Sequence, residues 1–232
     1  MVGSGQRRSD FMYHYVEDKE FLRRAQSDSS RRLKKVENLL RDEYEVNSQI
    51  FLVGSGGRNM VTQNENQPID FDYNLNIISC PDWNDAKGIK ESVRKAMNRI
   101  MQEEGLRDVQ DSTSSLTTYS MFFNDDIDSN WSIDLCIVKK NNQGEWERLI
   151  HEKTGFTCND RYFWNTAPSS KEYSEKAKAI KSIPGWWNTV REKYLNIKNL
   201  YLTRNDRNHP SFICYIEAVN NVYNEMRQKR II

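Results

Sequence analysis

Two aspartates separated by one residue, Asp70 and Asp72, have the types and the spacing that suit a divalent metal ion. They lie in segment 69–77, where apolar and polar residues alternate as in a β-strand. Side chains two apart on a strand point to the same face, so both carboxylates project together while Phe71 and Tyr73 face the other way. Adjacent carboxylates repel each other unless a cation lies between them, and Mg²⁺ prefers hard oxygen ligands. The pair therefore predicts a magnesium site.

A glycine-rich turn precedes this strand. The apolar run 50–53 ends in the sequence Gly54-Ser55-Gly56-Gly57. Such a turn offers backbone N–H groups to a phosphate. It is not a Walker A loop, because no Gly-Lys-Ser or Gly-Lys-Thr follows. Next to the paired carboxylates, the turn predicts a site for a metal-bound nucleoside triphosphate.

A third carboxylate, Asp134, lies in the middle of the apolar segment 131–138. Burying a carboxylate without a partner is unfavourable, so Asp134 needs one. It is either a structural residue held by hydrogen bonds or an ion pair, or a third ligand of the same metal site. Beside Asp70 and Asp72, the third ligand is the better explanation.

The elements that position these residues follow from hydrophobic periodicity. We expect a helix from Asp10 to about Arg24, a second helix capped within 27–30 and ending near Tyr44, and a short helix that starts within 57–62. A further helix, capped by Asn84 or Asp85, ends at Gly105 and covers one face of the sheet.

The second half changes from strands to helices. Strands are expected near 107–110 and at 116–123, and a long polar turn at 124–130 leads into the strand that carries Asp134. Residues 145–153 read as an edge strand. Helices follow: one from Ser169 or Ser170 to Ile183, one over 186–202 and one after Pro210.

Composition sets the class of protein. The chain has 232 residues, 29% of them charged and 37% apolar, with a formal net charge of +1. This length buries one good core with a smaller helical appendage. The near-neutral charge disfavours a long nucleic-acid partner. The N-terminal residues lack the apolar core of a signal peptide, and no apolar stretch approaches the ~20 residues of a membrane span. We expect a cytoplasmic protein that does not associate with a membrane.

Taken together, these motifs resemble the DNA polymerase beta-like nucleotidyltransferase superfamily. Its hallmark is an apolar residue followed by Gly-Ser, a spacer, an Asp-apolar-Asp strand and a third Asp on a later strand. Val53-Gly54-Ser55, Asp70-Phe71-Asp72 and Asp134 match it, over roughly residues 30–140. The resemblance implies an α/β (α+β) fold, a mixed β-sheet flanked by helices. We expect residues 1–165 to form the catalytic domain and residues 166–232 a helical C-terminal region.

The resemblance also implies roles. Asp70 and Asp72 would hold two Mg²⁺ ions, or Mn²⁺, and Asp134 would ligate the metal that activates the acceptor hydroxyl and act as its general base. Gly54 and Ser55 would hold the phosphates of a nucleoside triphosphate such as ATP. The reaction implied is in-line attack on the α-phosphate with release of pyrophosphate.

Three further residues are candidates for nucleotide binding. Arg58 is either a bidentate phosphate ligand or an exposed arginine at the start of a helix. Tyr119 and Ser120 are expected on the strand that pairs with Asp134, where they would line the nucleotide pocket. The acceptor stays open among a small molecule such as an antibiotic, a nucleotide, an RNA end and a protein side chain.

Two readings compete with a transferase. One is a catalytically inactive relative that acts as a binding or antitoxin-type protein, and the other is a structural α/β protein whose acids lie at the surface. The intact acids and the apolar surroundings of Asp134 argue against both. One departure from the family stands out: the spacer from Ser55 to Asp70 is longer than usual, which predicts a reshaped loop over the phosphates.

Overall fold

The computed structural model describes residues 12–65, 67–167, 171–206 and 210–232. Its contacts divide the chain into two compact units. Residues 17–58 and 68–168 form one, called here the sheet unit, and residues 1–16, 59–67 and 169–232 form the other, called the helical unit. The two are described separately. The domain boundary expected near residue 165 stays a prediction.

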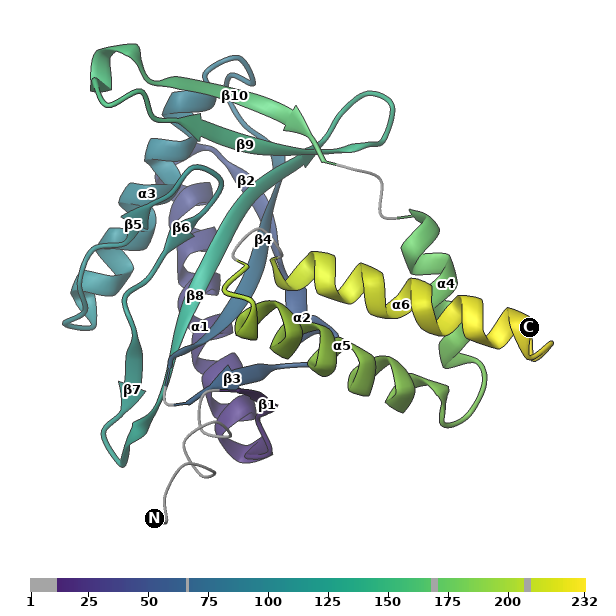
Figure 1. The fold of residues 1–232 in the computed structure, drawn as a ribbon. Coiled ribbons are helices and arrows are strands. Elements are labelled where there is room, and N and C mark those ends of the chain that lie inside the picture. The colour runs from purple at the N-terminus through teal and green to yellow at the C-terminus, as the bar shows by residue number, and fades with distance from the viewer. Residues whose placement is uncertain (1–11, 66, 168–170, 207–209) are drawn as a thin grey trace. The chain divides into compact units, whose positions relative to one another are not determined.

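A mixed β-sheet forms the sheet unit (Figure 1). Its main path runs in the order β10-β9-β8-β4-β2, in which only β4 and β8 are parallel. The short strands β6 and β7 also pair with β8, and β5 pairs with β6. The strands are β2 (Asn47–Leu52), β4 (Ile69–Ser79), β5 (Gln110–Asp111), β6 (Leu116–Thr117), β7 (Met121–Phe123), β8 (Asp126–Lys140), β9 (Trp146–Glu152) and β10 (Arg161–Thr166). The mixed sheet flanked by helices confirms the predicted fold class.

Strand β4 shows why the acids share one face. Its apolar residues, from Ile69 to Ile77 in steps of two, are all buried. The polar residues between them are Asp70, Asp72, Asn74 and Asn76, and they project from the opposite face. The alternation expected from the sequence is therefore confirmed, and it gives the sheet one apolar and one polar face.

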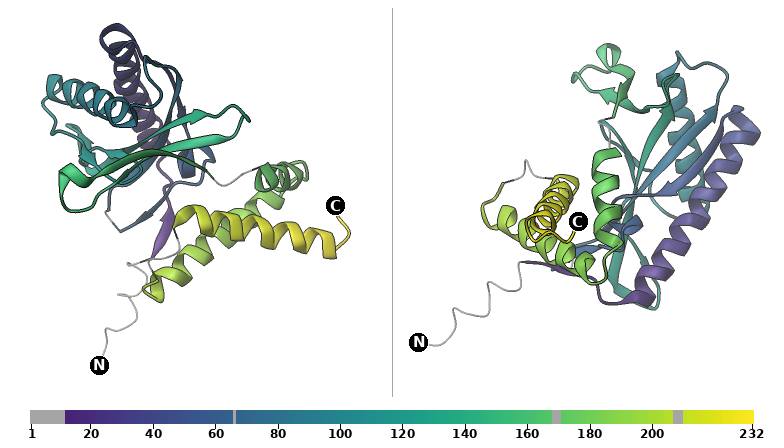
Figure 2. Two further views of the ribbon diagram at one scale, coloured as in Figure 1. Left: turned by 90° about the horizontal axis from the view of Figure 1, so that it is seen from above. Right: turned by 90° about the vertical axis from the view of Figure 1, so that its right-hand side faces the viewer.

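Two helices cover the apolar face (Figures 1 and 2). They are α1 (Lys19–Tyr44) and α3 (Ala86–Glu103). Helix α3 is capped by Asp85, whose side chain accepts a hydrogen bond of 2.7 Å from the Gly88 N–H, as the sequence predicted. Short α2 (Gly54–Gly57) follows β2, and a 3-10 turn spans Thr157–Asn159.

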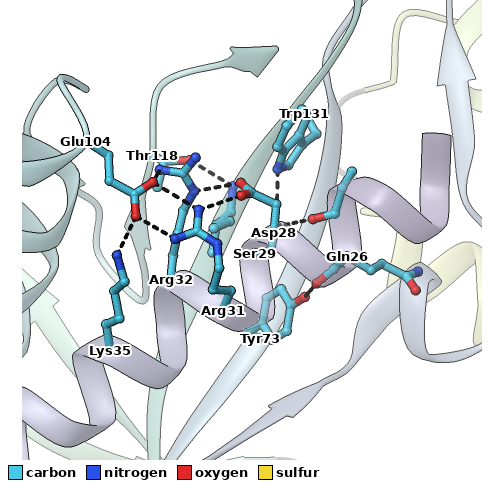
Figure 3. A network of polar contacts seen from close by, with 12 residues as sticks. Gln26, Asp28, Ser29, Arg31, Arg32, Lys35, Tyr73, Glu104, Thr118 and Trp131 are labelled. Atoms are coloured by element: carbon cyan, nitrogen blue, oxygen red, sulfur yellow. Dashed lines mark hydrogen bonds and ion pairs between the residues drawn. The ribbon is translucent and has the colours of Figure 1, made fainter. Parts of the chain in front are cut away.

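Polar contacts fix α1 against the sheet and against the end of α3 (Figure 3). The indole N–H of buried Trp131 on β8 donates to the Ser29 hydroxyl over 3.1 Å. At the surface, Arg31 and Lys35 both reach the carboxylate of Glu104, the residue that ends α3. The Arg31 hydrogen bond is the main cause that lowers the pKa of Glu104 to about 2. The carboxylate therefore stays charged and holds the end of α3 against the middle of α1.

The expected division into two N-terminal helices is wrong, although the second one does end at Tyr44 as predicted. Residues Tyr13–Tyr15 form a strand, β1, and everything from Lys19 to Tyr44 is one helix capped by Asp18. The serines at 27–30 lie inside that helix, where the Ser29 hydroxyl donates to the carbonyl of Ala25 instead of capping a new start. The expected cap at Asp10 lies outside the described residues.

Two other local predictions also need correction. Residues 124–130 are not a long loop, because β8 already begins at Asp126 and only a short turn separates it from β7. Segment 145–153 does form a strand, β9, but β10 pairs with its outer side, so β9 is not an edge. Sequence periodicity shows that a strand exists but not how many neighbours it finds.

The helical unit contains α4 (Lys171–Lys181), α5 (Trp186–Thr203) and α6 (Ser211–Gln228), together with a two-stranded sheet of β1 and β3 (Thr62–Asn64). The helices were expected, apart from the cap at Ser169 or Ser170, which lies outside the described residues. No helix in the described part of the chain is both long and apolar enough to cross a membrane.

The long spacer between Ser55 and Asp70 takes part in this helical unit. Its Thr62–Asn64 segment pairs with Tyr13–Tyr15, and Met60 is buried in the core of the three helices. The Arg191 guanidinium donates to the carbonyl of Asn59 over 2.6 Å. The helix expected to start within 57–62 is wrong: α2 already starts at Gly54 and ends at Gly57, and the short strand Thr62–Asn64 follows it after a turn. The extra length is therefore a structural part of the second unit.

This division predicts that a cavity-creating substitution in the core of one unit lowers the hydrogen-exchange protection of that unit and not of the other. Met60 is 1% exposed in the helical unit and Met101 is 0% exposed in the sheet unit, and removing either side chain creates a cavity that lowers the free energy of unfolding by roughly 2–4 kcal/mol. Hydrogen exchange should show loss of protection in α5 and α6 for Met60→Ala, and in α1 and α3 for Met101→Ala. The same pattern in both variants would contradict the division.

Candidate active site

Strands β4 and β8 bring the three predicted acids together. In their parallel register, Asp72 and Asp134 are direct Cα partners, and Asp70 is the partner of Ser132. Paired residues of neighbouring strands project to the same face, so the three carboxylates lie on the polar face of the sheet. The sequence predicted Asp134 as a third ligand because it lies within an apolar strand, and the register of β8 with β4 sets it beside Asp72.

The glycine turn reaches this group of acids through the backbone. The N–H of Val53 donates to the carbonyl of Asp72 over 2.8 Å, which fixes the end of β2 against β4. Gly54 follows with φ +60°, a left-handed conformation that favours glycine. A Cβ atom at this position would overlap the carboxylate of Asp72. Only glycine allows the turn to approach the acid this closely.

Hydroxyl groups hold two of the carboxylates. Ser132 donates to Asp70, and Thr117 on β6 donates to Asp134. None of the three acids forms an ion pair within the described residues. Sequence analysis missed both hydroxyls. Ser132 is two residues before Asp134 on one strand, so the period of two would have found it. Thr117 comes from a different strand, and its register with Asp134 has no local signal.

Burial and neighbouring carboxylates raise the pKa values of Asp72 and Asp134. Burial is the main cause that raises the pKa of Asp72 to about 6, and the charges of Asp134 and Asp70 add to it. Nearby Arg58 and Arg148 act in the opposite direction. Burial also raises the pKa of Asp134, which the Thr117 hydrogen bond partly offsets. A bound cation would relieve this repulsion.

The donor chemistry of the site suits Mg²⁺ or Mn²⁺, because its ligands are carboxylates and hydroxyls without a competing cation in an ion pair. In the structure, the side chains are not gathered around one point: no group of three or more His, Cys, Asp or Glu residues among those described is arranged to hold an ion. Asp70 and Asp134 are turned to their hydroxyl partners. The residues present fit the predicted metal, and the identity of the ion stays a prediction.

Of the candidates for nucleotide binding, some lie beside the acids and others do not. Ser55 lies within α2 and Arg58 directly after it, where its charge acts on Asp72. Tyr119 and Ser120 are not on a strand: they lie in the break between β6 and β7, and Thr117 is the residue on this side of β8 that pairs with Asp134. The Tyr119 ring contacts the Arg107 guanidinium at 4.8 Å instead. Their role in nucleotide binding stays a prediction.

A mixed sheet with helices on one face, a Gly-Ser turn against an Asp-x-Asp strand and a third Asp on the adjacent parallel strand together define a nucleotidyltransferase fold. No protein-family model and no curated protein matches the sequence.

Solved structures do match. They include the CD-NTase CdnG of Bradyrhizobium diazoefficiens in complex with GTP, with a TM-score of 0.53 and 14% identity over 84% of this chain and 65% of that one. The CdnE cyclic dinucleotide synthase of Elizabethkingia meningoseptica, with GTP and Apcpp, gives 0.51 and 14% over 84% and 69%. Vibrio cholerae DncV bound to GTP gives 0.53 and 13% over 90% and 52%.

These similarities confirm the predicted resemblance to the superfamily at the level of the fold. The chain spans between 52% and 69% of the length of these three structures.

The raised pKa of Asp72 predicts how the stability of the metal-free protein changes with pH. The folded state binds this proton more tightly than the unfolded state, so stability falls as pH rises through about 6. In EDTA at pH 7.5, Asp72→Asn should raise Tm by roughly 2–4 °C, or about 1 kcal/mol, because it removes the buried charge. The gain should shrink at pH 4.5. Thermal melts across this range test the prediction.

Asp42→Asn is the matched control, since Asp42 is exposed at the end of α1 and should show no such pH dependence. A gain for Asp72→Asn that is equal at both pH values would contradict the assignment of the charge to this site.

Proposed function

We propose that this protein is a Mg²⁺-dependent nucleotidyltransferase, which moves a nucleoside monophosphate from a nucleoside triphosphate to a hydroxyl group and releases pyrophosphate. The observation that carries the proposal is the register of β4 and β8, which sets Asp72 beside Asp134 and Asp70 two residues away, all on the face opposite to the buried apolar residues of β4. The similarity of the fold to structures solved with GTP supports it.

The donor triphosphate would lie between the glycine turn and the acids. The backbone N–H groups and the hydroxyl at Gly54 and Ser55 would bind its phosphates, and Arg58, which directly follows the turn, would add a positive charge. Asp70 and Asp72 would hold the metal. When bound, the metal neutralises the phosphate charge and stabilises the oxygens that attack and leave.

In the reaction, the acceptor oxygen forms a bond to the α-phosphorus while the bond to the bridging oxygen of the β-phosphate breaks. The electron pair of that bond leaves with pyrophosphate. Asp134 would accept the proton of the acceptor hydroxyl, because it lies across from the donor-side pair on the neighbouring strand. The Thr117 hydroxyl would keep the Asp134 carboxylate oriented.

Among the acceptors that the sequence left open, we propose a second nucleotide. The similarity to a CdnE described as a cyclic dinucleotide synthase supports this choice. The competing function is an inactive relative that binds nucleotides only. The observation in its favour is that the hydroxyls of Ser132 and Thr117 donate hydrogen bonds to Asp70 and Asp134. These bonds keep two of the acids ordered without a metal.

Activity of acid-to-amide variants separates these two functions. The purified protein should consume α-labelled ATP or GTP with Mg²⁺ and release pyrophosphate, and Asp70→Asn or Asp134→Asn should lower the rate by at least about 100-fold, because each removes transition-state charge stabilisation. Radiolabel chromatography and a pyrophosphate assay measure both products.

The Asp42→Asn variant should keep full activity. Nucleotide binding without turnover in the unmodified protein, with all four ribonucleoside triphosphates supplied together, would instead support the inactive relative.

A further inference from the structure

Arg148 lies on the same face of the sheet as the acids. It is on β9, where its Cα partner on β8 is Val138. Val138 is four residues beyond Asp134 on the same strand, so the side chains of Asp134, Val138 and Arg148 project to one side. Four residues of a strand span about 13 Å, which is comparable to the distance from the sugar hydroxyl to the terminal phosphate of a nucleoside triphosphate.

The guanidinium of Arg148 is left without a partner. Its Nε is buried and forms no hydrogen bond, and within the described residues Arg148 takes part in no ion pair. Other arginines of this unit are paired, among them Arg32 with Asp28 and Arg94 with Glu91. A half-buried guanidinium that lacks a partner is unfavourable by itself. Such a group suits an anion that comes from outside the chain.

The acids of the site do not satisfy Arg148. Its charge acts on Asp72 and on the Cys136 thiol, lowering both pKa values against the larger effect of burial. It forms no hydrogen bond with either group, while Asp134 is held by Thr117. Arg148 therefore faces the site without closing an ion pair there.

Free amides flank Arg148 in a row across four strands. Asn76 on β4 is the partner of Val138, and Asn165 on β10 is the partner of Arg148. Within the described chain, neither amide side chain forms a hydrogen bond, and the same is true of Asn74, one pair closer to the acids. An amide offers both donors and acceptors, as a nucleotide base and sugar require. The row Asn76–Val138–Arg148–Asn165 therefore has the chemistry of a ligand-facing surface.

The strand order separates the side of the site that would bind the donor triphosphate from the side that would bind the acceptor. The glycine turn follows β2, and Arg148 is on β9, so the acids on β4 and β8 lie between them. If the donor phosphates occupy the turn, an anion at Arg148 belongs to the molecule on the Asp134 side.

We propose that Arg148 binds a phosphate group of the acceptor nucleotide and thereby positions its hydroxyl toward Asp134. The assignment of this phosphate to the acceptor rests on the proposed function, whereas the anion site at Arg148 does not. It disfavours a cationic acceptor such as an amino sugar, which Arg148 would repel.

Binding in the absence of metal tests the anion site separately from catalysis. In EDTA the three acids repel phosphate, so AMP or GMP should bind at Arg148, measured by calorimetry on the full chain. Arg148→Gln should weaken this binding at least about tenfold, the effect of losing a charged hydrogen-bonded contact, and Arg148→Lys should restore part of it. Arg161→Gln, an exposed arginine on β10, should leave it unchanged.

Kinetics then test the role in transfer. With donor saturating, Arg148→Gln should raise KM for the acceptor at least tenfold and change kcat less, while Arg148→Lys shows an intermediate KM. Melting curves and far-UV spectra show whether each variant is folded, and the comparison of Arg148→Lys with Arg148→Gln holds even if both are less stable.

Two results would overturn the inference: no monophosphate binding by the unmodified protein in EDTA, or equal losses for Arg148→Gln and Arg161→Gln. If binding depends on Arg148 but the unmodified protein transfers nothing, the anion site stands and the proposed function fails.

Discussion

The parallel pairing of β4 with β8 is the constraint on which the site depends. Each strand alone carries its acids on one face because side chains alternate, but only the register sets Asp72 opposite Asp134. A shift by one residue would turn Asp134 into the helix-covered core and expose its apolar neighbours. The buried odd-numbered residues of both strands, packed under α1 and α3, therefore also fix the positions of the carboxylates.

A parallel pair cannot be closed by a tight turn, and here α3 lies between the two strands in sequence. Helix α3 thus serves both as the connection and as part of the cover of the apolar face. The network in Figure 3 complements this arrangement, because Glu104 at the end of α3 accepts from Arg31 and Lys35 of α1 while Trp131 of β8 donates to Ser29. The helix that connects the two parallel strands therefore also covers the apolar face beneath the acids.

Close packing of the three negatively charged carboxylates opposes the stability that the packed sheet provides. Burial and mutual repulsion raise the pKa values of Asp72 and Asp134, so the ionised, metal-free site lowers the stability of the fold. The hydroxyls of Ser132 and Thr117 partly compensate by donating to two of the acids. Arg148 leaves its positive charge unpaired on the same face. A site in which negative groups lack a cation and a positive group lacks an anion suits a ligand that supplies both, as a metal-bound nucleotide does.

Local periodicity by itself determined a large part of this protein. It predicted the strand that carries Asp70 and Asp72, the glycine turn and the capped helix after Asp85, because strand alternation, caps and glycine turns depend on residues a few positions apart. The mixed-sheet fold class followed from the resemblance of these motifs to a known superfamily. It misread residues 10–30, where helical spacing of apolar residues concealed a strand and one long helix.

Tertiary structure alone decided the rest, because it depends on pairing between distant segments. Thr117 reached Asp134 through the register of β6, Tyr119 and Ser120 fell into a break between strands, and Arg148 joined the acid-bearing face through β9. The long spacer after Ser55 was visible in the sequence as an anomaly, but its strand partner is residue 13–15, far away along the chain. Spacing determines which face a side chain takes, and only the folded sheet determines what it meets there.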